Sequence, residues 1–155
     1  MDTLKKQKHL VYFYTAVGVV PFVAAFVGIL DDDLSISAPS QFILSIYAVV
    51  IFSFLGGVYW GVSFAREQIS INKKTSSMLL VLGVFPPLLA WLSVTTLQPN
   101  FALVVLGGFF ILQALGDFAL AKKGLLPKWY GMLRIWVSTV VTLILWSAAW
   151  IKAAS

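Results

Sequence analysis

Asp117 is the acidic residue that stands out in this sequence, because it lies deep in an apolar stretch that otherwise lacks acidic side chains. Gln113 precedes it by one helical turn, so the two side chains would share one face of a helix. Arg134, inside the next apolar stretch, is the cation that could compensate Asp117. A carboxylate, a guanidinium and an amide at one level could lock two helices together or bind the polar group of a ligand. An ionisable residue in such a stretch is by default a functional-site hypothesis.

Five long apolar stretches must position these side chains. They cover residues 10–30, 42–65, 76–97, 101–121 and 129–151. Each is long enough to cross a bilayer as a helix, which takes about 20 mostly apolar residues. The composition agrees, since 60% of the 155 residues are hydrophobic and 11% are charged, against about 25% charged residues in soluble domains. The sequence therefore predicts an all-α membrane protein: one domain, built as a five-transmembrane-helix bundle, with a first loop that runs from Asp31 through Pro39.

Basic residues alternate between the connections, and this alternation predicts the orientation of the bundle. Three precede the first stretch, three lie in the second loop and three in the fourth, whereas the first and third loops have none. Because Lys and Arg are enriched in cytoplasmic loops, we expect the N-terminus in the cytoplasm and the C-terminus outside. Asp31, Asp32 and Asp33 then form a solvated external cap rather than a cation site, since three consecutive residues cannot all point at one ion. The lack of an Arg-rich, Ser-rich transit peptide favours a bacterial inner membrane, with the mitochondrial inner membrane as the alternative.

Asp117 and Arg134 are expected at the same depth in the membrane. Asp117 lies five residues before Lys122, and Arg134 lies six residues after Lys128. At a rise of 1.5 Å per residue, both are roughly 7 to 9 Å inside the cytoplasmic boundary. We therefore predict an ion pair or a water-bridged pair between the fourth and fifth helices. Aromatic side chains gather at the same depth: Tyr59, Trp60, Trp129 and Tyr130.

Three interpretations of this cluster stay open. It can be an aromatic belt with an ion pair that locks two helices. It can be a site of proton or ion conduction, although one carboxylate without a buried histidine makes a poor relay. It can also be an aromatic-lined pocket in the inner leaflet. The ligand-binding residues of that pocket would be Asp117 and Arg134 at its polar end, with Gln113, Tyr59, Trp60, Trp129 and Tyr130.

A stripe of small residues predicts where helices approach each other closely. Ser53, Gly57, Gly61 and Ala65 recur every four residues in the second stretch and include a GxxxG pattern. In lipid, small residues let helix backbones come close, so the pattern is typical of helix packing. We expect a packing seam within the molecule, with a homodimer seam as the alternative, and the pattern does not choose an oligomeric state.

The residue types argue against most familiar catalytic chemistry. The chain has no cysteine and one histidine, so we predict no metal site, no cofactor and no Cys–His or Ser–His nucleophile. The expectation is a non-enzymatic protein that binds a small amphipathic ligand or a lipid from the cytoplasmic leaflet. The first alternative is a structural or assembly factor for another membrane protein. The second is a lipid-modifying enzyme with Asp117 as base and Arg134 as phosphate clamp, although one carboxylate leaves acid–base catalysis incomplete. Nucleic acid is not an expected partner, because the paired lysines suit anionic lipid.

Three groups of short motifs run from the second apolar stretch to the fifth. They are Ser53-Phe54-Leu55-Gly56-Gly57 with Trp60-Gly61, Gln113 with Gly116-Asp117, and Pro127 with Trp129-Tyr130 and Leu133-Arg134. These motifs resemble those of a family of small integral membrane proteins, which is bacterial and has a mitochondrial branch known as transmembrane protein sixty-nine. The resemblance implies an inner-membrane location. Since that family is a domain of unknown function, the resemblance implies no activity and no cofactor.

Overall fold

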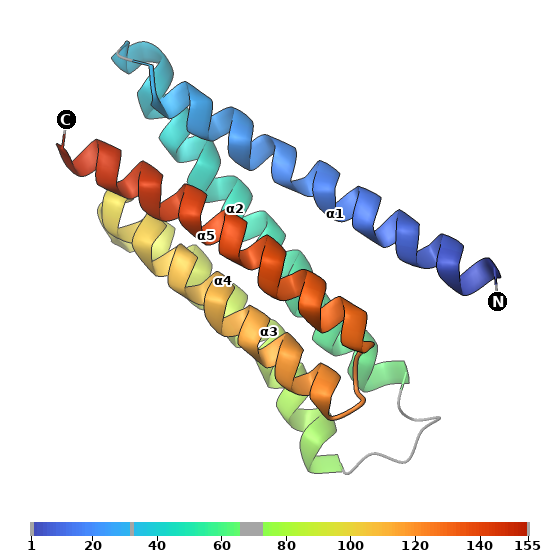
Figure 1. Ribbon diagram of the computed structural model, residues 1–155. Helices are drawn as coiled ribbons and strands as arrows, with labels where there is room; N and C mark the ends of the chain where they lie inside the picture. Colours follow the sequence, from blue (N-terminus) through green and yellow to red (C-terminus); the bar gives the residue numbers. More distant parts are fainter. Residues whose placement is uncertain (1, 32, 66–72, 155) are drawn as a thin grey trace.

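The computed structural model describes residues 2–31, 33–65 and 73–154, which form helices joined by short connections (Figure 1). The helices are α1 (Asp2–Ile29), α2 (Leu34–Phe64), α3 (Lys73–Thr96), α4 (Pro99–Lys122) and α5 (Lys128–Ala154). These described ranges contain no strand. Each helix is long and apolar enough to cross a membrane, which confirms the predicted all-α membrane fold with five helices. Asp32 and Arg66, which belong to the loops considered above, lie outside the described residues.

α2 begins at Leu34, earlier than the sequence pattern indicated, because Asp33 caps it. The Asp33 side chain accepts a hydrogen bond from the backbone N–H of Ser35 at 2.8 Å, and Asp31 accepts one from the N–H of Asp33 at 2.9 Å. The cap satisfies an N–H that has no partner within the helix. Pro39 therefore lies inside α2. The sequence pattern had placed it in the first loop, and that expectation is wrong. The bond from the Ser35 N–H also holds the pKa of Asp33 below its ordinary value.

The helices run back and forth along the bundle, so the two termini lie at its opposite ends (Figure 1). α4 packs most extensively on α5, and α2 packs on α3. α1 lies on the outside, against α2 and to a smaller extent against α5. Figure 1 also shows that α1 diverges from the other helices toward its N-terminal end. The candidate site lies along this diverging half of α1.

A tight connection sets the register of α4 and α5. Gly124 follows α4 with a φ of 72°, a left-handed conformation that glycine adopts without steric cost. The N–H of Leu125 then bonds to the carbonyl of Leu120 at 2.9 Å, which is the pattern of a Schellman motif. Farther along the pair, side chains of α5 donate hydrogen bonds to backbone carbonyls of α4. This antiparallel register brings Arg134 opposite Asp117.

The apolar core lies toward the end of the bundle where α1 joins α2. Side chains from every helix contribute to it. α1 contributes Phe22, Ala25 and Ile29, all from its C-terminal half. Residues 6–15 of α1 are exposed or half-buried instead. The molecule is therefore tightly packed at one end and more open at the other.

The stripe of small residues in α2 faces out of the molecule, so the expectation of an internal packing seam is wrong. A Cβ atom added at Gly57 or Gly61 would meet nothing within 4 Å. α2 approaches α3 on another face, where Gly56 lies against the backbone of Gly83. The adjacent Gly56 and Gly57 offer the helix two faces for close approach, and the structure uses the face of Gly56. The exposed stripe consists of Ser53, Gly57, Gly61 and Ala65.

Candidate ligand-binding site

Asp117 and Arg134 form an ion pair between α4 and α5, which confirms the predicted pairing. Arg134 Nε donates to Asp117 Oδ2 at 2.8 Å, and the side chains are 5% and 2% exposed, respectively. The contact joins one donor to one carboxylate oxygen. Arg134 Nη2 and Asp117 Oδ1 are also buried, and neither has a hydrogen-bond partner among the residues that the structure describes. The pair therefore leaves part of its hydrogen-bonding capacity unused.

Two more polar groups lie on the same seam between α4 and α5. Gln113 is one turn before Asp117 and Ser138 is one turn after Arg134, so the antiparallel register sets them at one level. Gln113 Nε2 and Ser138 Oγ are buried, and the described part of the chain supplies no partner to either. An unpaired buried polar group costs about 1–3 kcal/mol, and a charged one costs more. The seam is thus a place where the polar atom of a ligand would be strongly stabilised.

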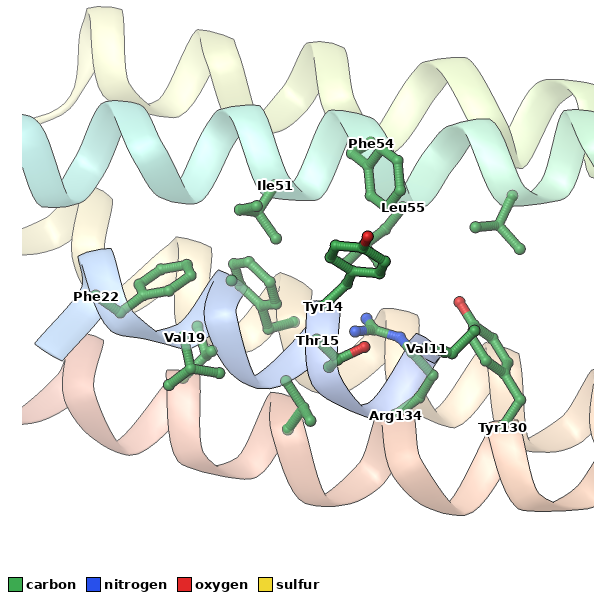
Figure 2. A pocket seen from close by; sticks show the side chains of 15 residues that line it. Val11, Tyr14, Thr15, Val19, Phe22, Ile51, Phe54, Leu55, Tyr130 and Arg134 are labelled. Carbon is green, nitrogen blue, oxygen red and sulfur yellow. The ribbon is translucent and has the colours of Figure 1, made fainter. Parts of the chain in front are cut away.

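An elongated cavity of about 410 Å³ lies between α1, α2 and α5. Its volume is within the range of small-molecule sites, about 300–1,000 Å³. Figure 2 shows the lining side chains, which surround one continuous space. Most of the wall is aliphatic or aromatic, with Val19 and Phe22 from α1, Ile51 and Leu55 from α2, and Val137 and Val141 from α5.

Polar groups collect at one end of this cavity. Tyr130 and Arg134 reach it from α5, and Tyr14 and Thr15 reach it from α1 (Figure 2). At the other end the wall is formed by Phe22, which belongs to the packed core. The cavity therefore has an apolar body and a polar end that bears hydrogen-bond donors. Such a shape suits an amphipathic molecule.

The cavity opens sideways, between α1 and α2. Tyr14 and Phe54 line it and yet are 66% and 72% exposed, so they also face the surroundings of the bundle. Between α1 and α5, in contrast, Tyr12 stacks on Trp129 with ring centroids 5.8 Å apart. Lys8 Nζ lies over the same contact, 5.8 Å from the Trp129 ring centroid. A molecule dissolved in the membrane would therefore enter from the side of α1 and α2.

Tyr59 and Tyr130, which were predicted site residues, lie beside the ion pair. Tyr59 is buried and interacts electrostatically with Asp117. Its hydroxyl packs on α4 at Gly116, 2.8 Å from the point where a side chain on that glycine would begin. Tyr130 lines the cavity one turn before Arg134. The two phenols thus flank the pair, one from α2 and one from α5.

Trp60 and Trp129 lie elsewhere, and neither is part of the cavity wall. Trp60 turns toward α3, where its Nε1 donates to the carbonyl of Leu80 at 3.1 Å. Trp129 is occupied by its stack with Tyr12. Both indoles hold neighbouring helices together. Of the predicted pocket residues, Arg134 and Tyr130 line the cavity, while Asp117, Gln113 and Tyr59 are buried behind it.

Sequence reasoning missed the α1 wall of the cavity. Val11, Thr15, Gly18 and Phe22 share one face of α1 at the spacing of successive helical turns. This face is hard to recognise because apolar residues occur on all sides of α1, so hydrophobic periodicity does not mark one face. Thr15, a polar residue on that face, is the signal that was available. Ser138 was missed too, although it follows Arg134 by one turn on the same face.

Five membrane-spanning helices, with a cavity that opens to the side, define the class of this molecule: a small integral membrane protein. Residues 7–150 match a protein family described as a protein of unknown function (DUF3429), and the chain belongs to that family. No curated protein matches the chain. No solved structure matches it either. The family assignment agrees with the uncharacterised membrane family expected from the motifs, and the mitochondrial relation stays a prediction.

Proposed function

We propose that the protein binds a small amphipathic ligand or a lipid, taken from the cytoplasmic leaflet of the membrane. The observation that carries this proposal is the position of Arg134, whose side chain belongs both to the ion pair and to the cavity wall. Its Nη2 is buried without a partner in the described ranges. An oxygen atom of a ligand could accept a hydrogen bond from the part of the guanidinium that faces the cavity, while the apolar wall would cover a hydrocarbon body.

A role in helix packing alone accounts for less of this geometry. Arginine and carboxylate form their strongest contact through two parallel hydrogen bonds. Here Nε makes the contact with Asp117, and Nη2 is left without a partner in the residues described. Because an unsatisfied polar group in a membrane costs several kcal/mol, a seam selected for stability alone would be expected to pair it. A ligand-binding role gives the guanidinium a second use, at the cavity wall.

We further propose that the protein binds its ligand without catalysing a reaction. Asp117 is engaged by Arg134 and is not part of the cavity wall, so it is poorly placed to take a proton from a bound molecule. The residues described include no group of three His, Cys, Asp or Glu side chains that could hold a metal ion. The lining hydroxyls of Tyr14, Thr15 and Tyr130 lack an adjacent base. Lipid-modifying chemistry would need groups that this polar end does not provide.

For the location, we propose a bacterial inner membrane with the N-terminus in the cytoplasm. Lys8 near the start of α1, Lys122 at the end of α4 and Lys128 at the start of α5 lie at one end of the bundle. The polar end of the cavity is at that same end, since Tyr130 and Arg134 lie two and six residues after Lys128 in α5. The positive-inside rule makes this end cytoplasmic. The head of a ligand would then face the inner leaflet, and the mitochondrial inner membrane is the alternative.

Filling the cavity tests the proposed function. Gly18 lines the cavity, and a Cβ atom added there meets nothing within 4 Å. The side chain of Gly18→Phe would therefore start in open space and take up part of the cavity. Gly57→Phe is the matched control, because a Cβ atom added there, on the exposed face of α2, also meets nothing within 4 Å.

The measurement is native mass spectrometry of the protein purified in mild detergent, together with analysis of the extracted lipids. Wild type and Gly57→Phe should retain a small molecule that Gly18→Phe lacks. Equal retention by all three proteins would contradict the proposed function.

The alternative, assembly with another membrane protein, stays a prediction that has one structural feature in its favour. The stripe from Ser53 to Ala65 is exposed along α2 and is available to a helix of another chain. A partner that co-purifies with wild type and is lost when Gly61 is made bulky would favour this alternative.

A further inference from the structure

The cavity has the length of an extended hydrocarbon chain. Val11 and Phe22 on α1 are eleven residues apart, as are Tyr130 and Val141 on α5, which corresponds to about 16 Å along each helix. The volume of about 410 Å³ and the largely aliphatic and aromatic wall leave room for one such chain along this length.

The polar end requires an acceptor on the ligand. A guanidinium has donors and no acceptor, and Arg134, which bonds to Asp117 through Nε, also lines this end of the cavity. Tyr14, Thr15 and Tyr130 add hydroxyl groups that can donate as well. Among the described residues that line the cavity, none is a carboxylate. The head of the ligand must therefore carry an oxygen that accepts a hydrogen bond from Arg134.

The charge of the site is already balanced. The Arg134 guanidinium is compensated by the Asp117 carboxylate at 2.8 Å, and both side chains are almost fully buried. An anionic head would add a second negative charge beside Asp117 with no further cation among the lining residues described. Burying such an uncompensated charge is costly in a medium of low dielectric constant. An uncharged carbonyl oxygen accepts the same hydrogen bond and adds no charge.

We infer that the ligand is a single-chain lipid whose head carries an uncharged carbonyl group, as in a ketone, an ester or a quinone. This inference rests on the proposed function, because it specifies the molecule that the same cavity binds. Fatty-acid carboxylates and phosphate heads conflict with the charge of the site. A plain alkane suits the apolar wall but offers no hydrogen-bond acceptor to Arg134.

Probes with a similar chain and different heads test the inference on delipidated protein in detergent. Methyl laurate, undecyl methyl ketone and a decyl-substituted benzoquinone present an uncharged carbonyl, and comparing the three separates the possible sources of that group. Laurate at mildly alkaline pH carries a negative charge, and dodecane has no acceptor. Binding is measured by native mass spectrometry and by the shift of the unfolding temperature. At least one carbonyl probe should bind about tenfold more tightly than laurate and dodecane, the effect expected of one hydrogen bond to a charged donor.

Two substitutions test the reason for this preference. Asp117→Asn removes the carboxylate and leaves the Arg134 cation uncompensated, so the preference should invert and laurate should bind more tightly than methyl laurate. Arg134→Lys keeps a cation beside Asp117 and removes the planar donor that faces the cavity. It should weaken binding of the carbonyl probes about tenfold, the loss expected for one such hydrogen bond, and leave dodecane binding unchanged.

The outcomes separate this inference from the function on which it rests. If wild type binds laurate more tightly than every carbonyl probe and Gly18→Phe abolishes that binding, the head assignment is overturned and the binding function stands. If a diacyl phospholipid competes fully with the probes for wild type, the single-chain assignment is overturned. If no probe binds, and Gly18→Phe and Gly57→Phe retain the same lipids as wild type, both proposals fail.

Discussion

Arg134 bonds to Asp117 through Nε, which leaves Nη2 as an unused donor on a side chain that also lines the cavity. One guanidinium thus joins the α4–α5 seam to the wall between α1 and α2. Its contribution to helix packing and its contribution to the cavity cannot be separated by removing Arg134 alone. The first prediction uses a paired substitution for this reason.

Breaking the ion pair should destabilise the protein more than replacing it. Asp117→Ala or Arg134→Ala strands a buried charge, so each should lower the free energy of unfolding by about 3–5 kcal/mol. Asp117→Leu combined with Arg134→Met removes both charges at similar volume and should recover most of that loss. Unfolding in detergent, followed by circular dichroism, measures these changes.

The same double variant distinguishes packing from ligand binding. Its stability should recover while the co-purifying small molecule is lost, because the donor at the polar end is gone. A double variant that keeps both its stability and its bound molecule would mean that the pair serves helix packing alone.

Two glycines of α2 should respond differently to the same substitution. Gly56 lies against the backbone of Gly83, so Gly56→Leu forces α2 and α3 apart, and overpacking of this kind costs about 1–3 kcal/mol or more. At Gly61 a Cβ atom meets nothing within 4 Å, so Gly61→Leu should leave the unfolding temperature nearly unchanged. Thermal unfolding and the mass of the detergent complex are compared for both. A lower mass for Gly61→Leu would identify the exposed stripe as a contact between chains.

The two ends of the bundle should lie on opposite sides of the membrane. Reporter domains fused after α5 and inserted between α2 and α3 should give signals from opposite compartments, with the second on the cytoplasmic side. Lysines concentrate at the end of the bundle where α1 and α5 begin. By the positive-inside rule that end is cytoplasmic. Reporters that respond from the same compartment would refute the proposed orientation.

The cap of α2 should titrate at acidic pH. The N–H of Ser35 bonds to the ionised Asp33 side chain and lowers its pKa below the ordinary value of 3.8. The stability that this bond contributes is therefore complete above pH 3.8, the unfolded value, and it declines as the pH falls through the lower pKa of the folded state.

Asp33→Asn gives the matched control, because asparagine also caps a helix and does not titrate. The difference in unfolding temperature between wild type and this variant should be constant above pH 3.8 and should shift against wild type below it. A difference that stays constant throughout the acidic range would argue against the cap. Because Asp33 is exposed, the shift should be small.

The five helices could be predicted because the membrane leaves the backbone little choice. In lipid each N–H and C=O must be paired within its own segment, so a long apolar stretch becomes a helix. The meeting of Asp117 and Arg134 could also be predicted. A short connection forces α4 and α5 to be antiparallel, and the rise per residue then sets both side chains at one depth. These conclusions depend on local geometry and chain length, which a sequence contains.

Which face of each helix meets a neighbour was decided by the tertiary structure alone. In lipid, apolar side chains cover both the inner and the outer faces, so hydrophobic periodicity does not mark the inside. The spacing of small residues favoured the face of Gly57, whereas α2 approaches α3 on the face of Gly56. The early start of α2 likewise depended on the Asp33 cap, which overrode the expectation that Pro39 belongs to the loop.

The cavity itself required the three-dimensional arrangement. It exists because α1 packs closely by its C-terminal half and diverges by its other half, and no residue pattern in α1 records that angle. The composition and spacing of the residues determined a five-helix membrane protein with one buried ion pair. The packing of α1 against α2 and α5 decided that Arg134 also lines a space open to the membrane, because a helix-crossing geometry depends on the shapes of all the contacting side chains together.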